Sequence, residues 1–316
     1  MMLGGWGVWW LARPGHMLSP LAQRATARPL LKYTFANLRA GKFAPDRIVY
    51  DGLYGKQDPR FASWTFHYYS GGKRVSGLAN LPVGVSTESG RINVPAILML
   101  HGSVDDGADY FPGFGTQPVA AFLAANGFAT FAPDFLDYGS SDKGGPDPFE
   151  DRFETYTTNM TILETLSKTA GRVGIWGHSN GGQIGLSILE ISGGSYPTVL
   201  WAPVSKMFPY NILYYTDVYA DGGKWLRAAL ARFEELYDVQ NYSTPNYLSW
   251  INAPILLQQG GADPWVPQKW SDEVYRVLKE KGKRIEYKVY PGADHNMQPR
   301  WAAAAADALA FFKSEL

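Results

Sequence analysis

The chain has 316 residues, of which 46% are hydrophobic, 18% charged and 15% aromatic. This composition excludes a disordered chain and is sufficient for a sizeable core. The charges of the 29 basic and 29 acidic side chains cancel, so no net field favours the binding of nucleic acid. The absence of cysteine excludes thiol nucleophiles, disulfides and thiolate metal sites. We therefore expect a small, nearly neutral substrate as the partner, and no nucleic acid.

The first 45 residues form a distinct segment, because they contain Lys and Arg but no acidic residue. No apolar run reaches the roughly 18 residues that a membrane span needs. The apolar stretch 3–11 precedes Arg13, which reverses the order of a secretory signal. We expect residues 1–45 to be a basic and aromatic extension lying on the domain, or an upstream start before Met17. A soluble, cytoplasmic protein is expected, although the basic segment leaves export open.

Short β-like runs begin at residue 48. Runs 64–69 and 75–81 flank Gly71-Gly72 and predict a hairpin. Run 96–100 is apolar throughout, as expected for a strand buried on both faces. Beyond it, strand and helix patterns alternate, with strands expected at 128–132, 173–176, 198–202, 255–259 and 285–290, and helices at 119–125, 153–166, 181–191, 270–281 and from 301.

This alternation predicts an α/β domain over residues 46–316, with a mostly parallel central sheet and helices on both faces. The rhythm breaks between the strands at 198–202 and 255–259. Residues 206–250 carry no strand pattern, are rich in aromatic side chains and include a helical run at 225–236. We interpret them as a small helical cap insertion.

The strongest local pattern is Gly177-His178-Ser179-Asn180-Gly181, placed between an apolar strand and an apolar helix. In this setting Gly-x-Ser-x-Gly forms a sharp turn that exposes the serine hydroxyl above the sheet, and close backbone passage requires the glycines. A nucleotide-binding glycine turn is the alternative, but this segment lacks the Gly-x-Gly-x-x-Gly spacing that such a turn requires. Ser179 is therefore the candidate nucleophile.

A serine nucleophile needs a base that is oriented by an acid, and with this turn they follow in the order Ser, Asp or Glu, His. Only His295 lies downstream of Ser179, in a loop after a predicted strand. Asp263 follows the strand at 255–259, where ligand-facing residues collect. Asp294 is the competing acid, but adjacent side chains in an extended loop point apart.

The tetrahedral intermediate requires two donors for its oxyanion. We assign the backbone N–H of Asn180, directly after the nucleophile, and that of Ser103, in the loop after 96–100. Tyr110 is a further candidate for contact with substrate through its hydroxyl. We expect His101 to brace this loop, and Asp134 and Asp137 to brace turns. No ligand set for a metal is evident.

Several of these pieces together resemble a known family over residues 47–316. They are His101-Gly102, Pro133-Asp134, residues 138–142, the 176–182 turn, residues 201–203, residues 254–267 and residues 291–295. The chain resembles the α/β-hydrolase superfamily, most closely its prolyl-oligopeptidase-like and dienelactone-hydrolase-like branch. The resemblance implies cleavage of a carboxylic ester or amide through an acyl-enzyme, without a cofactor, and with Ser179, Asp263 and His295 as the triad.

Two departures favour esters over peptides. Peptidases of this branch carry a β-propeller for which 316 residues leave no room, and Ser103 stands where many members have a second glycine after the histidine. Tyr214, Tyr215 and Trp265 would suit an apolar or aromatic acyl or alcohol group, with packing of the cap as the alternative. The rival functions are a small aminopeptidase or acylpeptide hydrolase and, more remotely, a non-catalytic binding protein of the same fold. The sequence leaves the oligomeric state open.

Overall fold

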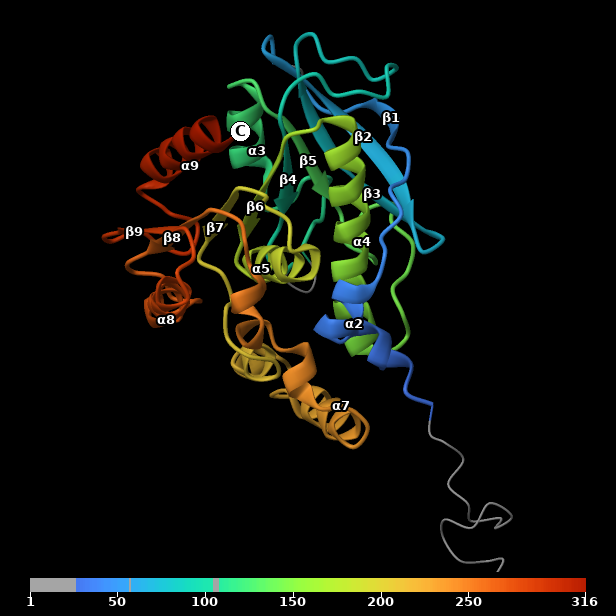
Figure 1. Cartoon of the computed structure of the whole chain (residues 1–316), viewed down its shortest axis with the longest axis vertical. Coiled ribbons are helices and arrows are strands. Elements are labelled where there is room, and N and C mark those ends of the chain that lie inside the picture. Colours follow the sequence, from blue (N-terminus) through green and yellow to red (C-terminus); the bar gives the residue numbers. More distant parts are fainter. Residues whose placement is uncertain (1–26, 57, 105–107) are drawn as a thin grey trace, which may run out of the picture.

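A computed structural model describes residues 27–56, 58–104 and 108–316. Within them, nine strands form one sheet in the order β1-β2-β3-β5-β4-β6-β7-β8-β9 (Figure 1). Pairing is antiparallel from β1 through β3 to β5 and parallel from β5 through β4 to β9. The strands are β1 (Val49–Leu53), β2 (Phe61–Ser70), β3 (Lys73–Pro82), β4 (Ala96–Leu100), β5 (Ala129–Pro133), β6 (Val173–His178), β7 (Thr198–Trp201), β8 (Ile255–Gly260) and β9 (Ile285–Tyr290).

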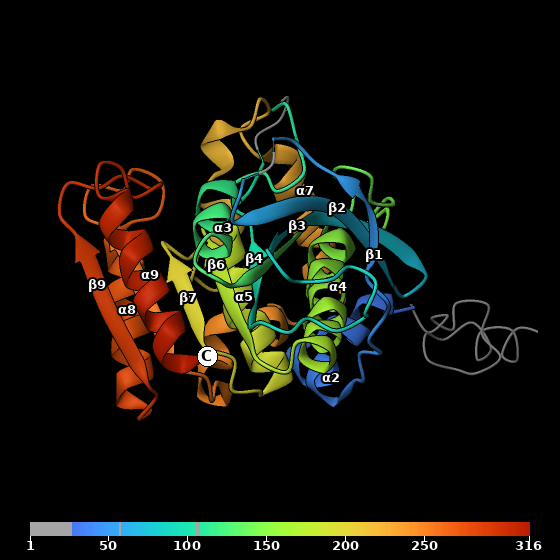
Figure 2. The same ribbon diagram turned by 90° about the horizontal axis from the view of Figure 1, so that it is seen from above.

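Helices cover both faces of this sheet, as seen from the side and from above (Figures 1 and 2). One core contains buried side chains of α3 and α9, and the other contains those of α2, α4, α5 and α8. The predicted α/β-hydrolase architecture is therefore confirmed. The helices are α2 (Phe35–Ala40), α3 (Gln117–Ala124), α4 (Pro148–Thr169), α5 (Asn180–Ser192), α6 (Tyr210–Leu213), α7 (Lys224–Glu234), α8 (Gln268–Glu280) and α9 (Trp301–Glu315).

Helix α4 is longer than the sequence pattern indicated. It begins at Pro148 instead of residue 153, because the Asp147 carboxylate caps it by accepting from Phe149 N at 2.8 Å and Glu150 N at 3.2 Å. Proline at the first helical position after an aspartate is a start signal. Apolar residues recur at helical spacing only from Phe153 onward, so the sequence pattern did not indicate the first turn.

Residues 206–250 contain short helices and no strand. Aromatic side chains pack this segment against the core. The ring centroids of Phe208 and Phe233 lie 5.6 and 5.1 Å, respectively, from the ring centroid of Phe149, which is on the first turn of α4. The segment and that turn are therefore neighbours. That the segment caps the catalytic site remains a prediction.

The described part of the N-terminal extension packs into the domain. A short 3₁₀ helix, η1 (Pro29–Tyr33), and α2 bury Leu30 and Phe35. Leu30 N donates to Tyr237 Oη at 3.2 Å, and Tyr242 Oη donates to Leu30 O at 3.1 Å. The boundary at residue 45 remains a prediction, and residues 1–26 of the extension lie outside the described residues.

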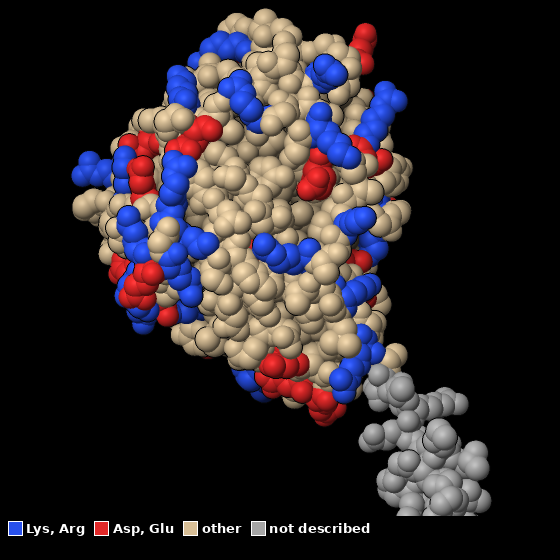
Figure 3. Space-filling view, viewed as in Figure 1, with Lys and Arg blue, Asp and Glu red and all other residues tan. Residues whose placement is uncertain are grey.

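The surface has no dominant sign of charge on the face shown in Figure 3, where basic and acidic side chains are interspersed around broad uncharged areas. This matches the zero formal net charge of the chain. Among the described residues, no helix is both long and apolar enough to cross a membrane.

Candidate active site

Ser179 lies at the sharp turn between β6 and α5, in the centre of the parallel part of the sheet. Its backbone is strained, with φ 57° and ψ −119°, a conformation that costs a non-glycine residue about 1–3 kcal/mol. The turn is held on both sides of the residue: Ser179 N donates to Trp201 O at 2.9 Å, and Ser179 O accepts from Val204 N at 3.0 Å. Hydrogen bonds to β7 and to the loop after it therefore fix the position of this serine.

The glycines around Ser179 are needed because backbone passes close to them. A Cβ on Gly177 would overlap the Gly181 carbonyl, and a Cβ on Gly181 would overlap the carbonyl oxygens of Leu100 and His101. A Cβ on Gly102 would come within 3.1 Å of the Ser179 Cβ. The loop after β4 therefore lies directly against the turn that carries Ser179.

Asp263 and His295 form the hydrogen-bonded pair expected of an acid and a base. The distance from His295 Nδ1 to Asp263 Oδ2 is 2.8 Å, and the Asp263 carboxyl is fully buried while the His295 side chain is 13% exposed. Asp263 Oδ1 also accepts from Trp265 N and Val266 N at 2.8 and 2.9 Å. Burial alone would raise the pKa of Asp263, but the hydrogen bonds and the imidazole hold it below its usual value.

This pairing fixes the tautomer of His295. Nδ1 must carry the proton that it donates to the carboxylate, which leaves Nε2 as the nitrogen able to accept one. The competing acid, Asp294, instead accepts from the backbone N–H groups of Asn296 and Gln298. The structure therefore pairs His295 with Asp263, and Asp294 braces the loop.

His178 supports the His295 loop, a role that the sequence did not reveal. Its Nε2 donates to the His295 carbonyl oxygen at 2.9 Å, and the two rings lie 4.5 Å apart. Burial, reinforced by the charge of His295, lowers the pKa of His178 to about 3. His178 is thus a neutral hydrogen-bond donor at neutral pH. Only the tertiary fold brings β6 and the loop after β9 together.

A pocket of about 180 Å³ adjoins the nucleophile turn and is bordered by both predicted oxyanion donors, Ser103 and Asn180. As the first residue of α5, Asn180 has an N–H without an intrahelical partner. The rest of the lining includes the apolar side chains Phe135, Leu136 and Ile184. The two predicted donors therefore border one space, and their role as an oxyanion hole remains a prediction.

Four polar residues of this pocket were absent from the sequence-based prediction: Asp151, Arg152 and Thr155, on the first turns of α4, and Gln183, on α5. Arg152 Nη2 donates to Gln183 Oε1 at 3.3 Å. Arg152 lay just before the helix that the sequence predicted. Recognition of Asp147 and Pro148 as a helix start would have placed Arg152 inside this helix.

Tyr110 lies in a braced loop, with its hydroxyl donating to Asp134 Oδ1 at 2.6 Å. Asp134 also accepts from Ser76 Oγ at 2.6 Å, and the His101 ring stacks on Phe135 at 3.9 Å. The bracing roles expected for Asp134 and His101 are confirmed. A contact between Tyr110 and substrate remains a prediction.

The other three residues predicted to contact substrate lie near the acid. The Tyr215 hydroxyl donates to Trp265 O at 3.3 Å, and the Tyr214 ring lies 5.1 Å from that of Tyr215. Tyr214 is 41% exposed and Trp265 52% exposed. These rings form an exposed aromatic group beside Asp263 and do not line the pocket at Ser103 and Asn180. Their contact with substrate remains a prediction.

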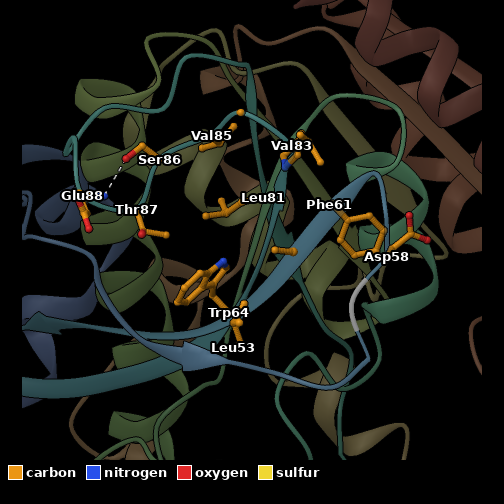
Figure 4. Close-up of a pocket in the computed structure, with 13 residues that line it drawn as sticks. Leu53, Asp58, Phe61, Trp64, Leu81, Val83, Val85, Ser86, Thr87 and Glu88 are labelled. Carbon is orange, nitrogen blue, oxygen red and sulfur yellow. Dashed lines mark hydrogen bonds between the residues drawn. The ribbon is translucent and has the colours of Figure 1, made fainter.

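A larger hollow, of about 470 Å³, lies at the antiparallel end of the sheet. Figure 4 shows Trp64 and Leu81 beside the loop that carries Val83, Ser86 and Glu88. The described lining of this hollow contains no histidine that could activate a hydroxyl. Elsewhere in the described ranges, no group of three histidine or carboxylate side chains is arranged to hold a metal ion.

Comparison with known proteins gives relatives of two kinds. The chain is 27% identical over 241 residues to "Uncharacterized peptidase YtmA" of Bacillus subtilis (strain 168), covering 75% of this chain and 87% of that protein. The acetyl xylan esterase of Paenibacillus sp. R4 has a similar structure, with a TM-score of 0.66 and 16% identity over 92% of this chain and 96% of that one. The acylaminoacyl peptidase of Pyrococcus horikoshii matches with a TM-score of 0.58 and 18% identity, over 82% of this chain and 42% of that one.

The structural matches are at low sequence identity and establish the fold. The family is established by a separate match, in which residues 119–316 fit the prolyl oligopeptidase family. That match spans more than half of the chain and includes Ser179, Asp263 and His295. The protein therefore belongs to the prolyl oligopeptidase family, a family of serine hydrolases with the α/β-hydrolase fold.

Proposed function

We propose that this protein hydrolyses carboxylic esters of small molecules through an acyl-enzyme intermediate. The observation that carries the proposal is the buried Asp263–His295 hydrogen bond of 2.8 Å, on the sheet whose central strand β6 presents Ser179 at a strained turn. Such an arrangement provides a nucleophile, a base and an orienting acid.

In this mechanism the Ser179 hydroxyl attacks the acyl carbon while His295 Nε2 takes its proton. Asp263 holds the imidazole in the required tautomer and stabilises the imidazolium that forms. The backbone N–H groups of Asn180 and Ser103 stabilise the oxyanion of the tetrahedral intermediate. His295 then protonates the leaving alcohol, and afterwards activates the water that hydrolyses the acyl-enzyme. These steps use no cofactor or metal.

The size of the pocket supports a small acyl group. Its volume of about 180 Å³ lies below the roughly 300–1,000 Å³ of typical small-molecule pockets. This volume accommodates a short acyl chain. The similarity to acetyl xylan esterases over nearly their whole length agrees with such a substrate.

Peptide hydrolysis is the second candidate, because the curated relative is called a peptidase and the family is named for one. The same nucleophile would then cleave an aminoacyl amide. The two functions differ in the leaving group, which is an alcohol in one and an amine in the other.

The test compares initial rates on para-nitrophenyl acetate, butyrate and octanoate with rates on aminoacyl para-nitroanilides. We expect ester turnover that favours the shorter chains and falls by at least roughly 10⁴-fold in Ser179→Ala. Asp263→Asn should lower kcat by roughly 10⁴-fold, because the amide cannot hold the required imidazole tautomer. Unchanged thermal unfolding midpoints would show that both variants are folded.

Faster cleavage of anilides than of esters would replace the ester proposal with the peptidase function. Turnover that persists in Ser179→Ala would contradict the assignment of the nucleophile. A fluorophosphonate that labels wild type but not Ser179→Ala would count against the non-catalytic binding protein.

A further inference from the structure

We propose that Arg152 binds a carboxylate carried by the ester substrate, so that the preferred substrates are esters with an acidic group a few atoms from the scissile bond. This inference rests on the ester hydrolysis proposed above, and it adds the chemical class of the substrate. It is argued from the position of Arg152, its lack of an ion-pair partner within the described ranges and the fixed side chain beside it.

Arg152 borders the same pocket as the two candidate oxyanion donors. The lining brings it together with Ser103 and Asn180, and the half-buried guanidinium comes from the first turns of α4. A substrate whose carbonyl oxygen faces Ser103 and Asn180 therefore has the rest of its acid or alcohol part within reach of this cation.

The guanidinium has no ion-pair partner among the described residues. Its hydrogen bond goes to a neutral amide oxygen, Gln183 Oε1, at 3.3 Å. Arginine stays protonated in proteins and carries five donors, of which this bond uses one. A partly desolvated cation of this kind is best satisfied by a carboxylate, which can accept two parallel hydrogen bonds.

Gln183 holds the guanidinium through a side chain that is itself fixed by hydrogen bonds. It is 2% exposed, and its Nε2 lies 2.8 Å from Tyr156 Oη, 2.8 Å from Ser187 Oγ and 2.9 Å from Thr244 Oγ1. With the amide nitrogen held among three hydroxyls, Oε1 is directed toward Arg152. Preorganisation of this kind reduces the entropy lost when a ligand binds.

The neighbouring acid, Asp151, borders the same pocket, but its carboxyl has contacts of its own in the 137–144 loop. Its carboxyl lies over Gly144, where an added Cβ would overlap it, and it is hydrogen-bonded to Asp137. Burial, together with the charges of Asp137 and Glu154, raises the pKa of Asp151 to about 6. Asp151 therefore interacts with the 137–144 loop, while Arg152 is left to interact with a ligand.

The experiment uses matched pairs of esters that differ in one charge. The first pair carries the group on the acyl side: mono-para-nitrophenyl glutarate and its methyl ester. The second pair carries it on the alcohol side: 4-acetoxybenzoate and its methyl ester. We expect kcat/KM to favour the acid by about 10- to 100-fold in one pair, the value for a charged hydrogen bond of about 1.5–3 kcal/mol. The pair that shows the preference identifies the side.

Arg152→Gln should reduce this preference to near one, because the loss in kcat/KM falls mainly on the acidic ester. Arg152→Lys keeps the charge and should retain part of the preference. Arg276→Gln removes a surface arginine paired with Glu280, outside the pocket, and should leave the preference unchanged. Equal rates on acid and methyl ester in both pairs, or equal losses on both esters in Arg152→Gln, would overturn the proposal.

A binding measurement separates this inference from the proposed function. Calorimetry of Ser179→Ala with monoethyl glutarate and with 4-acetoxybenzoate needs no turnover, and the double variant with Arg152→Gln should bind one of them at least tenfold more weakly. Binding that depends on Arg152 without any ester hydrolysis by wild type would sink the proposed function and keep the carboxylate site. Hydrolysis that depends on Ser179, with binding and rates indifferent to Arg152, would do the reverse.

Discussion

At the scale of single residues, the candidate site contains residues that a sequence motif identifies and residues that only their contacts in the folded structure identify. His295 and Asp263 act on each other directly, across the 2.8 Å hydrogen bond. His178 acts through the backbone of His295 and through ring contact at 4.5 Å. Its neutral state is part of this function, because only one imidazole nitrogen then donates.

His178 also makes stability depend on pH. Burial lowers the pKa of His178 to about 3 in the folded protein, against about 6.5 in an unfolded chain. The unfolded state therefore binds more protons as pH falls below 6.5, so the stability that the neutral imidazole contributes is present above pH 6.5 and is lost progressively toward pH 3.

We expect His178→Gln, which keeps a donor for the His295 carbonyl, to lose less stability than wild type between pH 7.5 and pH 5. The difference should be about 2 kcal/mol, measured as free energies of unfolding in urea at the two pH values. The comparison of the two proteins removes the contribution of the titratable groups that they share. These groups include Asp151 and also His101, where burial lowers the pKa to about 4. Equal pH dependence in the two proteins would show that His178 titrates normally.

At the scale of elements, the nucleophile turn depends on how closely β4 approaches the start of α5. The carbonyl oxygens of Leu100 and His101 occupy the space where Gly181 would carry a Cβ. Because backbone cannot yield as a flexible side chain can, a substitution there must displace the first turn of α5 and with it the Asn180 N–H.

Gly181→Ala should therefore lower the free energy of unfolding by about 1–3 kcal/mol or more, and should abolish most ester hydrolysis. The matched control is Gly52→Ala in strand β1, where an added Cβ meets no atom within 4 Å. That change should stay within about 0.5 kcal/mol of wild type. Urea unfolding and initial rates measured on both variants check the prediction, and similar losses in the two would contradict it.

At the scale of the whole molecule, the segment at 29–40 shares the core of the hydrolase domain. Phe35 is fully buried, and its ring stacks on that of Tyr247 at 4.9 Å and lies 5.9 Å from that of Tyr156. It thus connects η1 and α2 to α4 and to the segment between β7 and β8. The described N-terminal residues should unfold together with the rest of the domain.

Phe35→Ala should cost about 3–5 kcal/mol of stability, as a buried phenylalanine does in a core that relaxes only partly. Phe111→Ala removes a ring that is 44% exposed and should cost about 1 kcal/mol or less. The measurement is urea unfolding followed by tryptophan fluorescence, with one transition expected for each protein. If both variants were equally stable, the segment would lie on the surface without contributing to the core.

The sequence by itself determined the α/β alternation and the parallel sheet, and it named Ser179, Asp263 and His295 as the candidate triad. These features are local or ordered along the chain: an apolar strand, a glycine turn, and loops that follow strands. Parallel strands place their carboxyl ends at one edge, so residues far apart in sequence could be assigned to one site before any contact was known.

Only the tertiary structure decided the contacts of His178, Arg152 and Gln183. Each contact joins elements whose spacing in the chain carries no signal: β6 with the loop after β9, and α4 with α5. The start of α4 was also misplaced, because its first turn is fixed by the Asp147 cap and not by an apolar period. Sequence patterns report which face of an element is apolar, whereas side-chain pairing across elements depends on packing geometry that forms only when the chain folds.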